Sequence, residues 1–287
     1  MRHIITLSTI PPRFAGIAPA LNSLRAQTSR PEAIELYIPR SYRRFPQWGG
    51  GLPEVPEGVT IVRVDEDLGP ATKILPAAKA RRGQDIDLIY VDDDRTFGKT
   101  WVEKCLAQRR AHPRAAICGA GFSLKERYGY SFADDPLPRA VFALDPRLQL
   151  RVQISRLLRA VPLPGKGTKD LKAAVRRFDQ SGHVDIAEGY GGVMVRPEFF
   201  DDDSFDIPPV VWTVDDIWLS GCLTRQGIPI WADKDLWSVR EVVDTSLHHP
   251  LFKAVIEGAS RHEANRACVD YMRETYGIWG GEAVQRT

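Results

Sequence analysis

Hydrophobic residues in the first 120 positions fall into two alternating kinds of segment. Short runs rich in β-branched residues, typical of buried strands, cover residues 3–9, 33–38, 59–64, 86–91 and 115–118. Between these runs, apolar residues recur at helical spacing in segments 16–27, 71–80 and 100–112. Strands that alternate with helices over short connections predict an α/β fold, with a Rossmann-like, mainly parallel sheet and helices on both faces.

The alternation of predicted strands and helices stops after residue 122 and resumes near residue 184. Residues 148–159 fit both strand alternation and helical spacing, so the pattern leaves that segment open. Apolar residues 217, 219, 222 and 223 then fit a helix that packs on the sheet. We therefore expect one continuous domain made of three segments, which cover residues 1–122, 123–183 and 184–287.

Composition narrows the class of protein. The chain has 287 residues, 43% of them hydrophobic, and a formal net charge of +2, which gives no general case for nucleic-acid binding. Its first residues lack the long apolar core of a signal peptide, and no run reaches the length of a membrane span. The four cysteines are far apart and form no C-x-x-C pair. We expect reduced thiols and a cytoplasmic protein.

The clearest chemical signal is the acidic run that ends the fourth predicted strand. Asp92, Asp93 and Asp94 follow the apolar residues 88–91 directly. Three adjacent carboxylates repel one another, and a divalent cation such as Mg²⁺ or Mn²⁺ is a common compensation. A solvated acidic loop with a helix N-cap is the alternative interpretation.

Three later groups of residues could add to such a site. Asp215 and Asp216 precede the predicted helix, where they could also act as an N-cap or interact with the helix dipole. Glycines surround Tyr190 in the segment 189–192, which favours either a tight turn or the close approach of a ligand. His248 and His249 lie in a late loop and could complete a metal site.

A basic excess marks the middle of the chain. Residues 139–177 contain ten Lys or Arg against two acids. This excess fits either a solvated face or an electropositive wall that faces an anionic substrate or lipid surface. If the wall faces lipid, it predicts peripheral contact with the inner face of a membrane.

Together, and in this order, the motifs resemble those of the GT-A glycosyltransferases, especially the large and mostly inverting family two. Residues 4–9 followed by Leu24, Gln27 and Pro31 resemble the family's first strand and helix. Residues 68–73 stand at the family's short helix and lysine, and residues 90–94 resemble its D-x-D signature. The glycine-rich segment 189–192 and the acidic pair 215–216 match two further family features. The resemblance covers residues 3–121 and 184–249.

The resemblance implies a metal-dependent hexosyltransferase that acts in polysaccharide biosynthesis. Its donor would be a UDP-, GDP- or TDP-linked sugar, and its acceptor a carbohydrate or a glycolipid. Residues 1–122 would bind the donor, residues 123–183 would be a basic variable insertion, and residues 184–287 would hold the acceptor side and a helical tail. The donor-binding residues would be Thr9, Pro11, Arg13, Asp65, Gly69, Lys73, Asp92 and Asp93.

The resemblance also implies residues that bind the metal ion, residues that contact the acceptor and a general base. Mn²⁺ or Mg²⁺ would be bound by Asp94, Asp92, His248 and His249. The acceptor would contact Tyr190, Gly191, Gly192 and Trp212. Asp216 would be the general base of an inverting transfer, with Asp215 as the second choice. The family commonly has Glu-Asp where this chain has Asp-Asp, and it has a base-reading aspartate where this chain has 38–40, with Asp65 as the nearest substitute.

Two other functions fit the same residues. A nucleotidylyltransferase also uses carboxylate-bound Mg²⁺, but it needs a glycine-rich basic loop after its first strand, and residues 8–13 contain no glycine. A non-catalytic nucleotide-sugar-binding protein would keep the aspartates and bind the donor without turnover.

Overall fold

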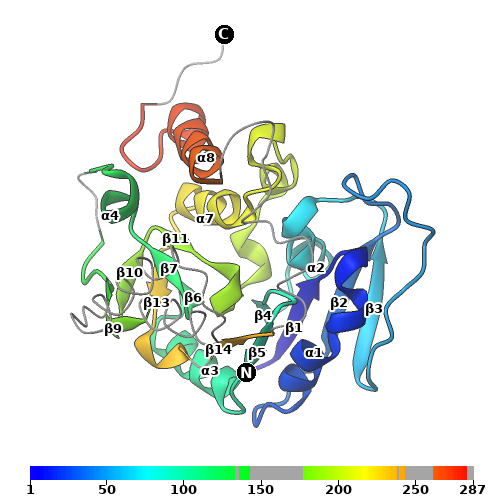
Figure 1. The fold of residues 1–287 in the computed structure, drawn as a ribbon. Helices are drawn as coiled ribbons and strands as arrows, with labels where there is room; N and C mark the ends of the chain where they lie inside the picture. Colours follow the sequence, from blue (N-terminus) through cyan, green and yellow to red (C-terminus); the bar gives the residue numbers. More distant parts are fainter. Residues whose placement is uncertain (133–135, 143–176, 238, 243–260, 283–287) are drawn as a thin grey trace, which may run out of the picture.

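The computed structural model describes residues 1–132, 136–142, 177–237, 239–242 and 261–282. Most of the basic segment 139–177, together with His248 and His249, lies outside these residues. Within them, the chain forms an α/β fold around a central eight-stranded sheet (Figure 1). Its strands are β1 His3–Ser8, β2 Ile34–Pro39, β3 Val59–Val64, β4 Asp87–Tyr90, β6 Ala116–Cys118, β10 Gly182–Val184, β12 Val193–Val195 and β13 Ile230–Ala232.

The order of the strands across the sheet is β10-β13-β6-β12-β4-β1-β2-β3. Strands β1 to β4 are parallel, and β6 pairs in parallel with β13. Strand β12 lies between β4 and β6 and is antiparallel to both, and β10 is antiparallel to β13. The chain runs outward from β1 to β3 and then returns to β4 on the other side of β1. Such a reversal opens a crevice at the carboxyl ends of β1 and β4, where ligands of open α/β sheets bind.

Alternate residues of the strands face two separate hydrophobic cores. In β4, Leu88 and Tyr90 belong to one core, while Ile89 belongs to the other. In β12, Met194 faces opposite to Val193 and Val195. Because both faces are covered, the central strands are apolar at consecutive positions.

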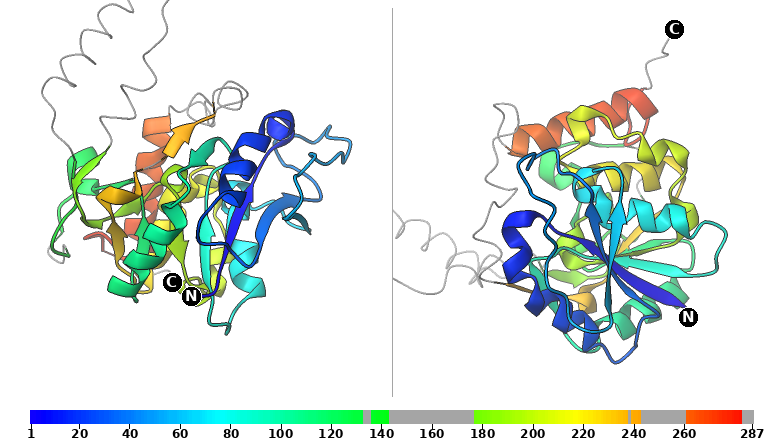
Figure 2. Two further views of the ribbon diagram at one scale, coloured as in Figure 1. Left: turned by 90° about the horizontal axis from the view of Figure 1, so that it is seen from below. Right: turned by 90° about the vertical axis from the view of Figure 1, so that its right-hand side faces the viewer.

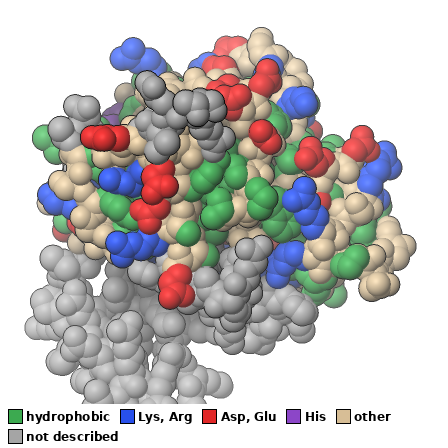
Figure 3. All heavy atoms as spheres, turned by 90° about the horizontal axis from the view of Figure 1, so that it is seen from above, with side chains coloured by type: hydrophobic (Ala, Val, Ile, Leu, Met, Phe, Trp, Pro, Cys, Tyr) green, Lys and Arg blue, Asp and Glu red, His purple; other side chains and the backbone are tan. Residues whose placement is uncertain are grey.

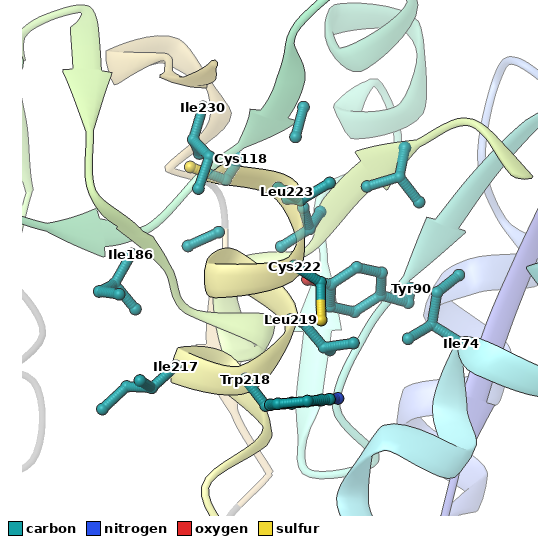
Figure 4. Close-up of a cluster of buried hydrophobic side chains, with 14 of the residues drawn as sticks. Ile74, Tyr90, Cys118, Ile186, Ile217, Trp218, Leu219, Cys222, Leu223 and Ile230 are labelled. Carbon is teal, nitrogen blue, oxygen red and sulfur yellow. The ribbon is translucent and has the colours of Figure 1, made fainter. Parts of the chain in front are cut away.

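Helices cover both faces of the sheet, as the sequence predicts (Figures 1 and 2). One face is covered by α1 Ala18–Arg25 and α3 Trp101–Ala111. The other is covered by α2 Leu75–Ala80, α7 Asp215–Arg225 and α8 Arg261–Tyr276. Figure 4 shows Leu219 and Cys222 of α7 beside Tyr90 of β4, in the core that also contains Leu88. This packing fixes the start of α7 near the carboxyl end of β4.

Shorter elements surround the sheet. Two-stranded ladders are formed by β7 Gly121–Phe122 with β11 Ile186–Ala187, by β5 Arg95–Phe97 with β14 Val239–Glu241, and by β8 Val141–Phe142 with β9 Phe178–Gln180. A short helix, α4, covers Leu124–Tyr128. The 3-10 helices are η1 Pro11–Gly16, η2 Gly69–Lys73, η3 Gly189–Gly191, η4 Pro197–Phe199, η5 Asp202–Phe205, η6 Pro209–Val211 and η7 Lys234–Leu236.

Two α-helices begin later in the chain than the sequence predicts. The helix expected from residue 16 starts at Ala18, because η1 precedes it. The helix expected over 71–80 is divided into η2 and α2, with Pro76 in the first turn of α2. Proline lacks the backbone N–H of a helix interior and fits the first turn. Among the described helices, none combines the length and the apolar character that a bilayer crossing requires.

Candidate active site

The acidic run after β4 meets the loop after β1 at the carboxyl edge of the sheet. Thr9 Oγ1 donates a hydrogen bond to Asp93 Oδ2 at 2.6 Å. Arg13 Nη1 donates to Asp93 Oδ1, also at 2.6 Å. The Asp93 side chain is almost fully buried, so these two donors replace the water that its carboxylate would otherwise bind. Asp93 thus joins the two loops and holds Arg13 at the crevice.

Lys73 is the centre of a second, larger cluster. Its Nζ lies 2.6 Å from Asp92 Oδ1 and 2.8 Å from Asp215 Oδ2. Burial alone would lower the pKa of Lys73, but the charges of Asp215, Asp92 and Asp216 outweigh it and hold that pKa well above its ordinary value. A permanently charged ammonium group therefore connects β4 to the start of α7.

Gly189, which has no side chain, leaves room for the ion pair between Lys73 and Asp92. A Cβ atom at this position would lie closer than van der Waals contact to Lys73 Nζ and 3.1 Å from Asp92 Oδ1. The backbone N–H of Gly189 also donates a hydrogen bond to Asp216 Oδ1 at 2.9 Å. The glycine-rich segment predicted from the sequence is thus a close approach of backbone to the acidic cluster.

Asp215 and Asp216 are adjacent but have different surroundings. Asp215 is ion-paired with Lys73. Burial, followed by the negative charge of Asp215, raises the pKa of Asp216 to about 8. No described residue donates a hydrogen bond to Asp216 Oδ2. Asp216 therefore combines a raised pKa with an oxygen, Oδ2, that accepts no hydrogen bond from the described residues.

Asp94 is the least compensated member of the acidic run. Its Oδ1 atom is buried, accepts no hydrogen bond and lies 3.3 Å from Arg95 Nε. Its Oδ2 atom lies 3.8 Å from Arg13 Nη1. Burial raises the pKa of Asp94 to about 6; Asp92 and Asp93 add to this effect, and Arg95 opposes it. A further cation placed beside this carboxyl would stabilise its ionised form.

The described residues could hold a divalent metal ion only if a substrate supplied further ligands. The described residues contain no group of three or more His, Cys, Asp or Glu side chains placed to bind a metal. Mg²⁺ is commonly held by one or two carboxylates together with substrate phosphates and water, and the buried oxygen of Asp94 fits that arrangement. Asp92, the second expected ligand, already has Oδ1 engaged by Lys73.

Trp212 and Gly69 lie together at the edge of this cluster. Gly69 has a positive φ of 60°, and a Cβ there would lie 2.7 Å from the carbonyl oxygen of Trp212. The indole Nε1 of Trp212 donates to the carbonyl oxygen of Asp67 at 3.3 Å. The expected donor-side glycine and the expected acceptor-side tryptophan are thus neighbours.

Asp65, the expected base-reading acid, is exposed, whereas the nearby Asp67, to which no role was assigned, is buried. The Asp65 side chain is 92% exposed and pairs with Arg40. Asp67 is buried, and its carboxylate accepts hydrogen bonds from the backbone N–H groups of Arg43 (2.8 Å) and Gly69 (2.9 Å). Sequence reasoning missed Asp67, although an acid two residues before a glycine is typical of an Asx-turn.

The remaining expected residues have mainly structural contacts. Pro11 opens η1. Gly191 packs against Ala120, and Gly192, with φ of 75°, packs against Trp101, so larger side chains would collide at both positions. Tyr190 lies under the guanidinium of Arg95, 5.2 Å from ring centre to Cζ.

A cavity of about 300 Å³ lies beside the glycine-rich turn. Its lining combines aromatic, acidic and basic side chains: Phe122, Ser123, Glu126, Arg127, Phe142 and Glu188, with Gly121. Glu188 precedes Gly189 directly and accepts a hydrogen bond from the Tyr190 hydroxyl at 3.2 Å. The cavity therefore adjoins the backbone that contacts Asp216.

No protein-family model matches this sequence, and no curated protein matches it either. Solved structures with a similar fold include S. aureus TarS 1–349 in complex with UDP (12% identity, TM-score 0.41), which covers 82% of this chain and 58% of that chain. They also include S. aureus TarS 1–349 (11% identity, TM-score 0.44), which covers 100% of this chain and 76% of that one. This chain thus spans less than two thirds of the first of these structures. TM-scores of this size carry no functional argument, so a function has to be inferred from the geometry of the site.

Proposed function

We propose that this protein is a glycosyltransferase that moves a sugar from a nucleoside-diphosphate sugar to an acceptor hydroxyl. The observation that carries the proposal is the meeting of Asp92, Lys73 and Asp215 at the carboxyl edge of the parallel strands. Position 215 lies 142 residues after position 73 (215 − 73), so the fold has brought distant charged groups to the crevice where α/β sheets bind ligands. The same site contains the carboxyl of Asp216, whose Oδ2 atom accepts no hydrogen bond from a described residue.

The donor side of the site would be built on Asp94 and Asp92. Asp94 would bind Mg²⁺ or Mn²⁺ together with the diphosphate of the donor. When bound, the ion would neutralise the charge that develops on the leaving phosphate. Arg13 would add positive charge from the loop after β1, where Asp93 holds it. Asp92, one third exposed, would accept hydrogen bonds from donor hydroxyl groups.

Asp216 would be the general base. Its Oδ1 atom is fixed by the N–H of Gly189, which leaves Oδ2 to accept the proton of the acceptor hydroxyl. Lys73 would hold Asp215 beside the base, and its own charge would oppose the effect of Asp215 by lowering the pKa of Asp216. A base that removes the proton while the hydroxyl attacks opposite the leaving group would give inversion.

The acceptor would enter from the side of Tyr190 and Trp212. The cavity lined by Phe122 and Glu188 offers aromatic and carboxylate groups, which are suited to sugar faces and hydroxyls. Its volume of about 300 Å³ is at the lower end of the usual range for ligand pockets. A carbohydrate or the sugar portion of a glycolipid fits this lining.

The direct test is turnover of a panel of UDP-, GDP- and TDP-sugars, measured with Mg²⁺ or Mn²⁺ and again with EDTA. We expect metal-dependent release of the nucleoside diphosphate, with loss in EDTA and in Asp94→Asn. A control is Glu57→Gln, which removes an exposed carboxylate in the loop before β3. Full turnover in Asp94→Asn would refute the metal role. Tight donor binding without turnover under any condition would favour the non-catalytic binding protein.

A further inference from the structure

Two adjacent arginines in the loop after β2 have no carboxylate partner at ion-pair distance among the described residues. The guanidinium of Arg43 lies 5.2 Å from the ring centre of Trp212. That of Arg44 lies 5.6 Å from the ring centre of Phe45. By contrast, Arg13 is ion-paired with Asp93 and Arg40 with Asp65. Arg43 and Arg44 thus bring positive charge that no described ion pair neutralises.

The loop that carries them is held firmly against the site. Tyr42 is buried, and its hydroxyl donates a hydrogen bond to the carbonyl oxygen of Thr9 at 2.8 Å. Its ring packs edge-on against Trp48, with 5.0 Å between ring centres. On the other side, the N–H of Arg43 donates to Asp67. A fixed loop loses little conformational entropy when it binds a ligand.

Both arginines lie close to the acidic crevice. Thr9, which anchors Tyr42, also binds Asp93, and Trp212 stands three residues before Asp215 in the chain. Burial and then the like charge of Arg13 lower the pKa of Arg44, so Arg13 and Arg44 repel each other. Figure 3 views the molecule from the side to which the carboxyl ends of β1 to β3 point, and shows Lys and Arg side chains on its right-hand part.

We propose that Arg43 and Arg44 bind a phosphate group of the substrate, with Trp212 as the platform that orients Arg43. Guanidinium groups form paired, charge-assisted hydrogen bonds with phosphate oxygens, and an anion between Arg44 and Arg13 removes their repulsion. The inference rests on the proposed function and deepens it, because the phosphate has two sources. It is either the diphosphate of the donor or a phosphate carried by the acceptor.

The test is calorimetric titration of the full chain with inorganic pyrophosphate in the presence of Mg²⁺. We expect Arg43→Gln and Arg44→Gln each to weaken binding about tenfold if the donor diphosphate is the source. Arg30→Gln is the matched control, since Arg30 is an exposed arginine just before the amino end of β2. It should change the affinity less than about twofold. Both target side chains are exposed, so thermal melting should show all three variants folded.

A second titration, with glycerol 3-phosphate at saturating pyrophosphate, separates the two sources. Binding that Arg43→Gln and Arg44→Gln weaken here, while pyrophosphate affinity is unchanged, assigns the pair to a phosphate on the acceptor. Unchanged affinity for both ligands in both variants overturns the inference. If phosphate binding depends on the arginines while no nucleotide sugar binds or reacts, the anion site stands and the proposed glycosyltransferase falls.

Discussion

A single ammonium group, that of Lys73, holds two of the carboxylates on which the site depends. Its side chain is 5% exposed and touches Asp92 and Asp215, which belong to segments far apart in the chain. Removing one member of a buried ion pair leaves the partner charge uncompensated, which costs more than the pair itself contributes.

Lys73→Met should therefore destabilise the protein and also remove activity. We expect a loss of about 3–5 kcal/mol in the free energy of unfolding, measured by urea denaturation at neutral pH. Lys79→Met is the control, because Lys79 lies in the next helix and is exposed. A loss no larger than that of the control would show that water or another cation replaces Lys73.

The raised pKa of Asp216 predicts how activity depends on pH. Only the ionised carboxylate can act as a base, so kcat/KM of the free enzyme should rise through an apparent pKa near 8 and then level off. Asp216→Asn should abolish this rise and lower the rate by about 10²–10⁴-fold. The profile can be measured between pH 5 and 10 with any donor that is turned over. The same midpoint in Asp216→Asn would assign the ionisation to another group.

The same shift has a consequence for stability. The folded pKa of Asp216, about 8, lies above its ordinary value of 3.8, so the folded state binds a proton that the unfolded state releases. This contribution to stability is complete below about pH 4 and is lost as the pH rises toward 8. Relative to the Asp216→Asn variant, wild-type protein should become less stable across that window.

At the scale of elements, α3 is attached to the sheet by one buried cation. Arg109 is fully buried and donates to Asp87 Oδ1 of β4 at 2.8 Å and to the carbonyl oxygen of Met194 in β12 at 3.2 Å. It also donates to the carbonyl oxygen of Ala115, just before β6. One side chain thus connects a helix to three neighbouring positions in the sheet.

Arg109→Met should loosen this attachment, because it leaves Asp87 buried without its cation. We expect a loss of about 3–5 kcal/mol in the free energy of unfolding. The neighbouring Arg110 is exposed, so Arg110→Met should leave stability within about 0.5 kcal/mol. Equal effects of the two substitutions, measured side by side by denaturation, would contradict the structural role of Arg109.

Elements whose signal is local were predictable from the sequence. The first three strands and α3 come within two residues of their predicted bounds, because β-branched runs and helical spacing are short-range patterns. The direction of β12 was not predictable, since three apolar residues such as Val193–Val195 fit a parallel or an antiparallel strand equally well.

In the site, too, residues with a local sequence signal were predictable, whereas contacts between distant segments were not. The acidic residues 92–94 and 215–216 could be found from the sequence, because each group is contiguous. The contact of Gly189 with Lys73, and the burial of Asp67 rather than Asp65, depend on packing between segments far apart in the chain.

At the scale of the whole molecule, residues 1–122 and residues 184–287 share one sheet. Strand β12 of the later segment lies between β4 and β6 of the earlier segment. Both hydrophobic cores draw on both segments, as Tyr90 with Trp218 in one core and Ile89 with Met194 in the other show. Neither core is therefore confined to one segment.

Unfolding should accordingly be a single cooperative transition. We expect tryptophan fluorescence and far-UV circular dichroism to give coincident urea curves, since tryptophans such as Trp101 and Trp218 report on the two cores. Two separated transitions would show that the two segments fold as independent units. A version of the chain limited to residues 1–122 should then fold, whereas the shared sheet predicts that it does not.

The late insertion of β12 also matters while the protein is being synthesised. Tyr90 pairs with Val193, which follows it by 103 residues (193 − 90), so β4 lacks this neighbour for about 5–20 s at ordinary elongation rates. During that interval, β4 is an open edge that could pair with another nascent chain. Asp87 at its start and the three aspartates after its end place charges at both ends of that edge. We therefore expect the acidic run of the site to oppose aggregation before the sheet is complete.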